Sequence, residues 1–214
     1  MKQVDEYNNA GIAYGSNKLI HAFGSDRGGL RPTVMQVLPA LVQGGVERTT
    51  VEIASAINKA GGRCIVVSAG GPMEHELART QAEHITLPVD SKNPLIMYAN
   101  VLRLIKIIRD KHVNIVHARS RAPAWSAWLA AKRSRVPFVT TFHGVYSFGG
   151  RLKLGYNAIM TRGKRVIANS TFVAGHVRKN YGIPLTRLRI IHRGVDLDRF
   201  NANKVPAERV VALA

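Results

Sequence analysis

The sequence predicts an α/β fold: a Rossmann-like, doubly wound and mainly parallel sheet in a single domain. From residue 34 onward, short β-branched runs alternate with segments of helical periodicity, as in parallel sheets covered by helices on both faces. The 214 residues are 46% hydrophobic, which is enough for one domain with a substantial core. Two adjacent glycines, Gly44 and Gly45, mark the turn between the first strand and the first helix.

The ends of the chain are expected to lie outside this domain. Residues 1–31 are rich in Gly, Asn and Ser without periodicity, which predicts a flexible N-terminal extension. The opening segment carries acids and amides where a signal peptide has its apolar region, and no apolar run approaches the roughly 18 residues of a membrane span. We therefore expect a cytoplasmic protein with at most a peripheral membrane contact. Cys64, the single cysteine, lies in an apolar run and is expected to be a buried, reduced thiol.

Six strands are expected from the β-branched runs. In chain order they are residues 34–38, 64–68, 84–88, 114–118, 138–144 and 165–169. The first helix carries an apolar stripe from Val46 to Ile57 and should end at the Ala-Gly-Gly of residues 60–62. Another helix is expected to open at Pro123, and Ser170 is expected to cap the helix that contains Val173.

The helix that follows Asn93 is apolar around most of its circumference. Its predicted core stripe is Met97, Val101, Ile105 and Ile108. Ile96 and Ile107 fall beside Arg103 and Lys106, where a globular helix usually keeps a polar face. Exposed isoleucines among basic residues would suit a bilayer surface or a partner, and packing under a neighbouring loop is the alternative.

The loops that follow the strands are the candidate ligand-binding segments, because doubly wound sheets bind ligands beyond the carboxyl ends of their strands. These loops are residues 39–45, 69–72, 88–94, 117–123, 142–150 and 169–170.

At Gly44 and Gly45 a ligand can approach the backbone closely, and the free N–H groups of a helix start favour an anion such as phosphate. A glycine pair that only makes a turn explains these residues equally well. The G-x-G-x-x-G pattern and a Walker lysine are both missing, which disfavours a nicotinamide dinucleotide site.

Four segments together resemble a known family: LPALVQGGVERTTVEIA, IVHARSRAPAW, FVTTFHG and RVIANSTFVAGHVRKNYGIPLTRLRIIHRGVDLDRF. Over residues 33–200 the chain is similar to the N-terminal domain of retaining glycosyltransferases of family four. The resemblance implies the GT-B architecture, in which two Rossmann-like domains face a cleft. It also implies glycosyl transfer from a sugar nucleotide to a glycolipid or polysaccharide acceptor, such as lipopolysaccharide or capsule. In that family the glycine loop borders the donor's diphosphate and sugar, so Gly44 and Gly45 are the implied donor-binding residues.

The resemblance also implies a division of the chain. Residues 32–200 would form the acceptor-side domain, and residues 201–214 would begin the interdomain linker. The family's E-x7-E motif and the basic residues that hold the nucleotide belong to a C-terminal donor domain, which is not in this sequence. We therefore expect an enzyme whose present chain is inactive alone. A binding-only protein made of a lone N-terminal domain is a further possibility. Arg193 occupies a place where many relatives have Asn.

His143 is the candidate catalytic residue. A histidine followed by glycine at the end of a strand faces the ligand crevice and can donate to a sugar hydroxyl or a developing charge. The resemblance places it near the transferred sugar; a histidine satisfied by the backbone is the alternative. His117 has similar geometry and a weaker claim. No metal-binding pattern is present, so we expect no metal and no cofactor beyond the sugar nucleotide as substrate.

The chain is strongly basic, with 31 Lys and Arg against 13 Asp and Glu and a formal charge of +18. This excess favours an anionic partner. The candidate acceptor-binding residues are Lys92, Arg119, Arg121, Arg151 and Lys153. They would suit a phosphorylated glycolipid or oligosaccharide at an anionic leaflet, since arginine grips phosphate with paired hydrogen bonds. A solvated basic face is the plain alternative for each of them.

A basic, nucleic-acid-binding α/β module is the alternative function, and it is favoured by the charge. The sequence has no helix-turn-helix, zinc-finger or RNP signature, and its glycines and histidines gather at strand ends, where small ligands bind. We therefore expect no nucleic acid as a partner.

Overall fold

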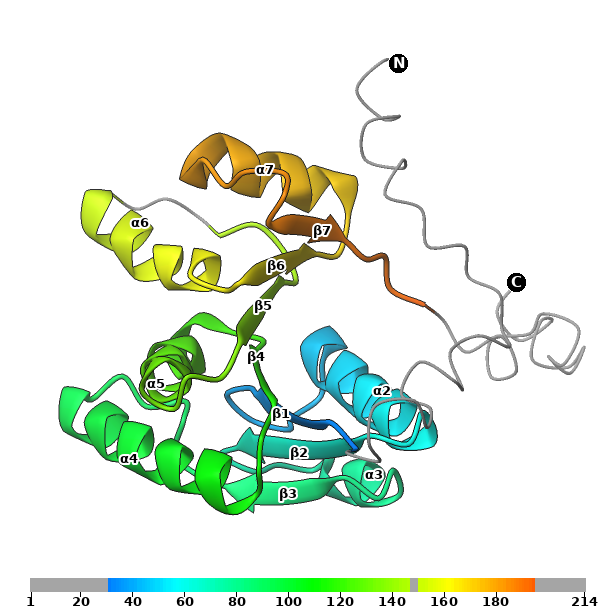
Figure 1. Cartoon of the computed structure of the whole chain (residues 1–214). Helices are drawn as coiled ribbons and strands as arrows, with labels where there is room; N and C mark the ends of the chain where they lie inside the picture. The colour runs from blue at the N-terminus through cyan, green and yellow to red at the C-terminus, as the bar shows by residue number, and fades with distance from the viewer. Residues whose placement is uncertain (1–30, 147–149, 195–214) are drawn as a thin grey trace, which may run out of the picture.

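The computed structural model describes residues 31–146 and 150–194, in which strands and helices alternate (Figure 1). The strands are β1 (Thr33–Val37), β2 (Arg63–Ser68), β3 (Glu83–Thr86), β4 (Ile115–Ala118), β5 (Phe138–Phe142), β6 (Arg165–Ala168) and β7 (Leu188–Ile190). The helices are α2 (Gly45–Lys59), α3 (Glu74–Ala78), α4 (Pro94–Asp110), α5 (Arg121–Arg133), α6 (Arg151–Asn157), the 3-10 turn η2 (Ala158–Thr161) and α7 (Thr171–Tyr181). The expected N-terminal extension, apart from Arg31, and the expected linker of residues 201–214 lie outside the described residues.

The strands form one parallel sheet in the order β3-β2-β1-β4-β5-β6-β7. The chain first moves outward from β1 to β3, then returns past β1 and continues in the opposite direction from β4. The order therefore reverses between β1 and β4, which is the point where open α/β sheets bind their ligands. The predicted doubly wound, Rossmann-like fold is confirmed.

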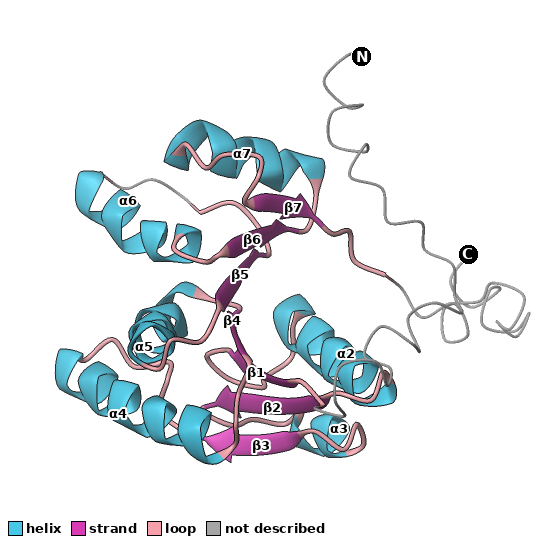
Figure 2. Ribbon diagram, viewed as in Figure 1, coloured by secondary structure: helices cyan, strands magenta, loops and turns pink. Residues whose placement is uncertain are grey.

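Helices cover both faces of the sheet, as Figure 2 shows. On one face α2 and α3 enclose a small core that includes Leu38, Leu41 and the buried Cys64. On the other face α4, α5 and α7 contribute to a larger core, which contains Met35, Val116 and Phe142 from the strands. The expected burial of Cys64 is confirmed, and burial raises the pKa of its thiol to about 11.

Several element boundaries follow the sequence closely. β1 begins one residue before the expected start, and α2 begins at Gly45 with Gly44 as its N-cap residue. Ser170 caps α7 by accepting a hydrogen bond from the Val173 N–H at 3.2 Å. By contrast, α5 begins at Arg121, before Pro123, because proline lacks only an N–H that the first helical turn does not use.

The prediction for the exposed side of α4 was wrong in its residues. The buried stripe is Asn100, Val101, Leu104 and Ile108. Ile107 packs against the larger core, whereas Leu95, Tyr98 and Leu102 are the exposed apolar residues, at 80%, 59% and 54% exposure. Two residues of the expected core stripe, Val101 and Ile108, are buried, and Ile105 packs against the larger core. The sequence pattern missed Asn100, whose side chain is buried and donates a hydrogen bond to the Pro88 carbonyl at 2.8 Å.

None of the helices within the described ranges is long and apolar enough to cross a membrane.

His117 is a structural histidine inside the sheet. It lies in β4, is 7% exposed, and its Nε2 is 2.7 Å from Thr141 Oγ1 in the adjacent strand β5. Burial, with smaller contributions from Arg119 and His143, holds its pKa well below 6.5. The imidazole is therefore neutral in the folded protein, whereas in the unfolded chain it gains a proton below about pH 6.5.

Removing this histidine should reduce the acid sensitivity of the fold. The unfolded state binds a proton that the folded state excludes, so the free energy of unfolding falls as the pH decreases below about 6.5. Between pH 7 and pH 5 the protonation of this single group in the unfolded state should lower the free energy of unfolding by about 2 kcal/mol. We expect the variant His117→Gln to lose about 2 kcal/mol less than the parent chain over the same interval in urea denaturation. Equal losses in the two proteins would show that His117 is protonated in the folded state.

Candidate functional site

Five loops meet at the carboxyl edge of the sheet near the reversal of strand order. They follow β1, β4, β5, β6 and β7 and carry, in that order, the Gly44–Gly45 turn, Arg119, His143, Asn169 and Arg193. Contacts described below join these residues into one cluster, which we call the edge cluster.

The glycine turn starts α2 without a side-chain cap. The backbone of Gly44 is extended, with φ at 171°, and both glycines are exposed. Steric clashes, rather than backbone strain, limit which residues fit at positions 44 and 45. A Cβ at Gly44 would collide with Glu47 Oε2, and a Cβ at Gly45 would collide with Arg193 Nη1. The sequence predicts that an anion binds to the backbone of this turn. In the structure the Arg193 guanidinium lies against Gly45, and the Glu47 carboxylate lies against Gly44.

Arg119 is a buried cation at the carboxyl end of β4, the strand that pairs with β1. Its side chain is 2% exposed, and Nη1 donates to Gln36 Oε1 at 2.7 Å. Gln36 lies in β1 and is held in turn by donating to the Thr50 carbonyl at 3.1 Å. Burial, and to a smaller extent Arg193, lowers the pKa of Arg119 to about 10. The side chain therefore stays charged at neutral pH.

No carboxylate lies within ion-pair distance of this charge among residues 31–146 and 150–194. The Arg119 Nε atom is also buried without a hydrogen bond to any described residue. A buried charge without a partner is costly. Its main effect on its surroundings is a positive field at the edge cluster.

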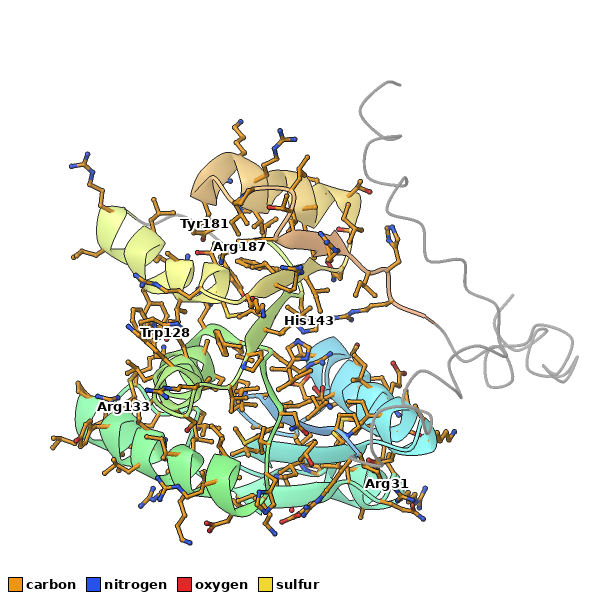
Figure 3. The ribbon with its side chains drawn as sticks, in the orientation of Figure 1. Arg31, Trp128, Arg133, His143, Tyr181 and Arg187 are labelled. Carbon is orange, nitrogen blue, oxygen red and sulfur yellow. The ribbon has the colours of Figure 1, made fainter. Side chains whose placement is uncertain are left out.

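His143 comes directly after β5 and lies beside the start of α2, as Figure 3 shows. Its Nδ1 accepts a hydrogen bond from Arg193 Nη2 at 2.9 Å, and its backbone carbonyl accepts one from Asn169 Nδ2 at 2.9 Å. Burial, then Arg119, then Arg193 lower the pKa of His143 to about 3. The imidazole is therefore neutral at physiological pH.

The hydrogen bond from Arg193 selects the tautomer of this neutral ring. Arginine has only donors, so Nδ1 of His143 carries the lone pair and Nε2 carries the proton. The Nε2 atom is buried and has no acceptor among the described residues. The Nε2–H of His143 is consequently a buried, unpaired donor, which a hydroxyl or a partial negative charge that reaches it would satisfy, as the sequence predicted for its chemistry.

Arg121 serves the packing of the domain. Its Nη1 donates to Asn157 Oδ1 at 2.8 Å, and its guanidinium lies 4.3 Å from the centre of the Tyr146 ring. These contacts connect α5 to α6 and to the loop after β5. The half-buried side chain keeps only part of its surface for a ligand.

The other predicted acceptor-binding residues are exposed on separate segments. Lys92 lies in the loop before α4, and Arg151 and Lys153 lie in the first turn of α6. The role of these five basic residues in acceptor binding remains a prediction.

Within the described part of the chain, no three His, Cys, Asp or Glu side chains are arranged to hold a metal ion. That the reaction needs no metal or cofactor is still a prediction.

Sequence reasoning missed two members of the site. The first is Gln36: the strand prediction for VMQVL assigns it no role, although a glutamine in an apolar run indicates a buried polar partner. For Arg193 the sequence shows a departure from relatives and predicts no role, because the short strand β7 before it is not expected from the sequence pattern. With β7 recognised, Arg193 would have been placed three residues beyond the carboxyl edge of the sheet.

Comparisons with known proteins agree with this architecture. The pattern of Glycosyltransferase Family 4 matches residues 43–199. A crystal structure of a glycosyltransferase from Rickettsia africae is 42% identical, with a TM-score of 0.74, and the match covers 86% of this chain and 48% of that one. The Anabaena protein HepE, solved with UDP and glucose, is 17% identical with a TM-score of 0.65, covering 84% of this chain and 48% of HepE. The likeness to HepE supports the fold alone.

The curated relatives share one name. A D-inositol 3-phosphate glycosyltransferase from Salinispora arenicola is 25% identical over 201 residues, which cover 88% of this chain and 44% of the relative. The enzyme of the same name from Mycolicibacterium smegmatis is 24% identical over 203 residues, covering 87% of this chain and 45% of the relative. The chain thus spans less than half the length of the curated relatives that it matches.

Proposed function

Because this chain belongs to Glycosyltransferase Family 4, we propose that it forms one wall of a site that transfers a glycosyl group from a sugar nucleotide to an acceptor. The observation that carries the proposal is the neutral His143. Its Nε2–H has no acceptor among the described residues, and Arg193, which donates to its Nδ1, lies against Gly45 of the glycine turn. Burial and the two neighbouring arginines keep the ring neutral.

Each part of the edge cluster has a role in such a reaction. As the bond between sugar and diphosphate breaks, negative charge develops on the leaving diphosphate. The N-terminal end of α2 and the nearby guanidinium of Arg193 would stabilise that charge, and the buried charge of Arg119 would add to the field. His143 Nε2 would donate to a hydroxyl of the transferred sugar and orient it. Since His143 is neutral and its Nδ1 is occupied, it serves as a hydrogen-bond donor rather than as a base.

The acceptor is proposed to be phosphorylated. The relatives named as D-inositol 3-phosphate glycosyltransferases support a phosphate on the acceptor, and the net charge of +18 suits it. The candidate residues for binding that phosphate are Lys92, Arg151 and Lys153, whose side chains are exposed to solvent. A glycolipid or oligosaccharide of the lipopolysaccharide or capsule type is the proposed class.

We also propose that a second domain, in the GT-B arrangement, supplies the opposite wall and the nucleotide pocket. The support is the length comparison: the Rickettsia africae protein is 42% identical, and only 48% of it is covered.

A contact with the inner face of the cell membrane is a further part of the proposal. The outer face of α4 carries Leu95, Tyr98 and Leu102 in its first half and Lys106 and Arg109 in its second half. These residues share one side of the helix by their spacing. Apolar side chains followed by basic ones suit the interface of an anionic leaflet.

The nucleic-acid-binding alternative rested on the net charge. The phosphate groups of a sugar nucleotide and of its acceptor are also anionic partners that suit a positively charged protein. The nucleic-acid-binding alternative therefore has no separate support.

Glycosyl transfer should require both a second domain and His143. The 214-residue chain alone should show no transfer from a panel of sugar nucleotides, whereas a chimera with the C-terminal half of a family member should be active. In that chimera, His143→Ala should lower kcat/KM roughly 10- to 100-fold, because one hydrogen bond in the transition state is lost.

The unfolding temperature should change little in this variant, and His75→Ala, on the exposed surface of α3, should retain full activity. Robust turnover by the short chain would refute the need for a second domain. A fully active alanine variant would remove His143 from the site.

The glycine turn should be needed for donor binding. Gly45→Val should weaken donor binding to the chimera by about tenfold or more, because the new side chain occupies the space of the Arg193 guanidinium and obstructs the start of α2. The clash is with the far end of a flexible side chain, so folding should be almost unaffected. Unchanged donor affinity and turnover would mean that the glycines only make the turn.

The exposed leucines of α4 should be needed for binding to anionic membranes. A Leu95→Gln/Leu102→Gln double variant should bind vesicles with anionic lipid about tenfold or more weakly than the parent chain in a sedimentation assay, since two exposed leucines are lost from the interface. Phe172→Gln removes an exposed apolar side chain from α7 and is the control. Equal binding of all three proteins would place the membrane contact elsewhere or exclude it.

A further inference from the structure

Arg193 occupies an unusual position for an exposed arginine. One end of its guanidinium, Nη2, donates to His143 Nδ1 at 2.9 Å, and the other end, Nη1, lies against the bare Cα of Gly45. The side chain therefore connects the loop after β7 with the loop after β5 and with the start of α2. Family membership alone assigns no role to this residue.

The surroundings of Arg193 are positive. The start of α2 carries a partial positive charge, and Arg119 is close enough that Arg193 lowers its pKa. Glu47 lies against Gly44 at the same turn, yet no carboxylate is within ion-pair distance of Arg193 in residues 31–146 and 150–194. Two arginines and a helix start repel one another unless an anion joins them.

The donors at this turn are also available. The first N–H of α2 that enters the helical hydrogen bonds is that of Arg48, which donates to the Gly44 carbonyl at 3.0 Å. The N–H groups of Gly45 and Val46 precede it and have no recorded acceptor in the described part of the chain. Within residues 31–146 and 150–194 the Arg193 guanidinium makes one hydrogen bond, to His143, so most of its five N–H donors have no partner in that part of the chain and can serve a ligand in the same space.

We propose that Arg193 is a substrate-binding residue, whose guanidinium, positioned by His143 Nδ1 over Gly45, binds a phosphate group of a substrate at the start of α2. The inference rests on the proposed function and names the residue and the chemical group that meet there. Arg193 then has a second effect, because its hydrogen bond to Nδ1 keeps the proton of His143 on Nε2. One side chain thereby binds the phosphate and orients the hydrogen-bond donor for the sugar.

Gly45 acquires a defined purpose in this arrangement. Any side chain at position 45 would displace the guanidinium from its place between His143 and α2. Gly45→Val and Arg193→Met should therefore damage phosphate binding by the same route, and their effects should not add.

The test is a titration of the 214-residue chain with pyrophosphate, and in parallel with D-inositol 3-phosphate, followed by the amide NMR signals of Gly45 and Val46 and by calorimetry. Arg193→Met should raise the dissociation constant at least tenfold, and Arg193→Lys should raise it less, since the charge stays while the paired N–H groups are lost. The matched control is Arg165→Met, which removes an exposed arginine from the opposite, amino-terminal edge of β6 and should change affinity less than twofold.

The result that overturns the proposal is equal affinity in Arg193→Met and Arg165→Met. A wild-type chain whose Gly45 and Val46 signals do not move with either probe would also overturn it. Should Arg193→Met unfold, Arg193→Lys decides: a threefold or greater loss supports the role, and no loss refutes it. Additive losses in the Gly45→Val/Arg193→Met double variant would refute the stated purpose of Gly45.

The two probes separate the sources of the phosphate. Tighter binding of pyrophosphate supports the donor's diphosphate, and tighter binding of inositol 3-phosphate supports the acceptor. Sugar transfer by the chimera separates this inference from the proposed function. Transfer that Arg193→Met leaves unchanged would refute the role of Arg193 alone, whereas phosphate binding without any transfer would refute the function alone.

Discussion

The edge cluster depends on one buried positive charge without an ionic partner in the described residues. Arg119 leaves β4 and is held by Gln36 Oε1 from the adjacent strand β1, so two neighbouring strands fix a guanidinium inside the domain. The neutral amide of Gln36 satisfies one donor of this guanidinium and leaves its charge unneutralised. A carboxylate at position 36 would have formed a buried ion pair and cancelled the field. Stability is given up here, as is usual where a protein keeps a site ready for a ligand.

The field of Arg119 determines the chemistry of its neighbours. Together with burial it keeps His143 and His117 neutral, and each histidine then forms a different kind of contact. His117, enclosed within the sheet, pairs with Thr141 and stabilises the packing of β4 on β5. His143, one strand further along at the edge, accepts from Arg193 and retains an unpaired N–H. The same physical effect thus produces a structural residue and a candidate functional one.

The parallel sheet explains why these groups can meet at all. Every strand ends at the same edge, so residues separated by 83 positions (Gln36 and Arg119) or by 50 (His143 and Arg193) come within hydrogen-bond distance. The reversal of strand order between β1 and β4 leaves the first turn of α2 uncovered beside them. A helix start, two cations and a neutral histidine therefore face one region, and phosphate and sugar hydroxyls are the groups that such a surface recognises.

The sequence by itself determined the α/β fold class, the start of α2 at the glycine turn, the Ser170 cap and the position of His143 at a strand end. These features follow from local periodicity, from turn and cap chemistry, and from the rule that parallel strands share one carboxyl edge. Only the tertiary structure decided that Arg119 is buried, that Arg121 packs on Tyr146, that Leu95 rather than Ile107 is exposed on α4, and that Arg193 lies on Gly45. Burial, charge state and hydrogen-bond partners depend on neighbours that are distant in sequence and on the local exclusion of water, and no local pattern contains that information.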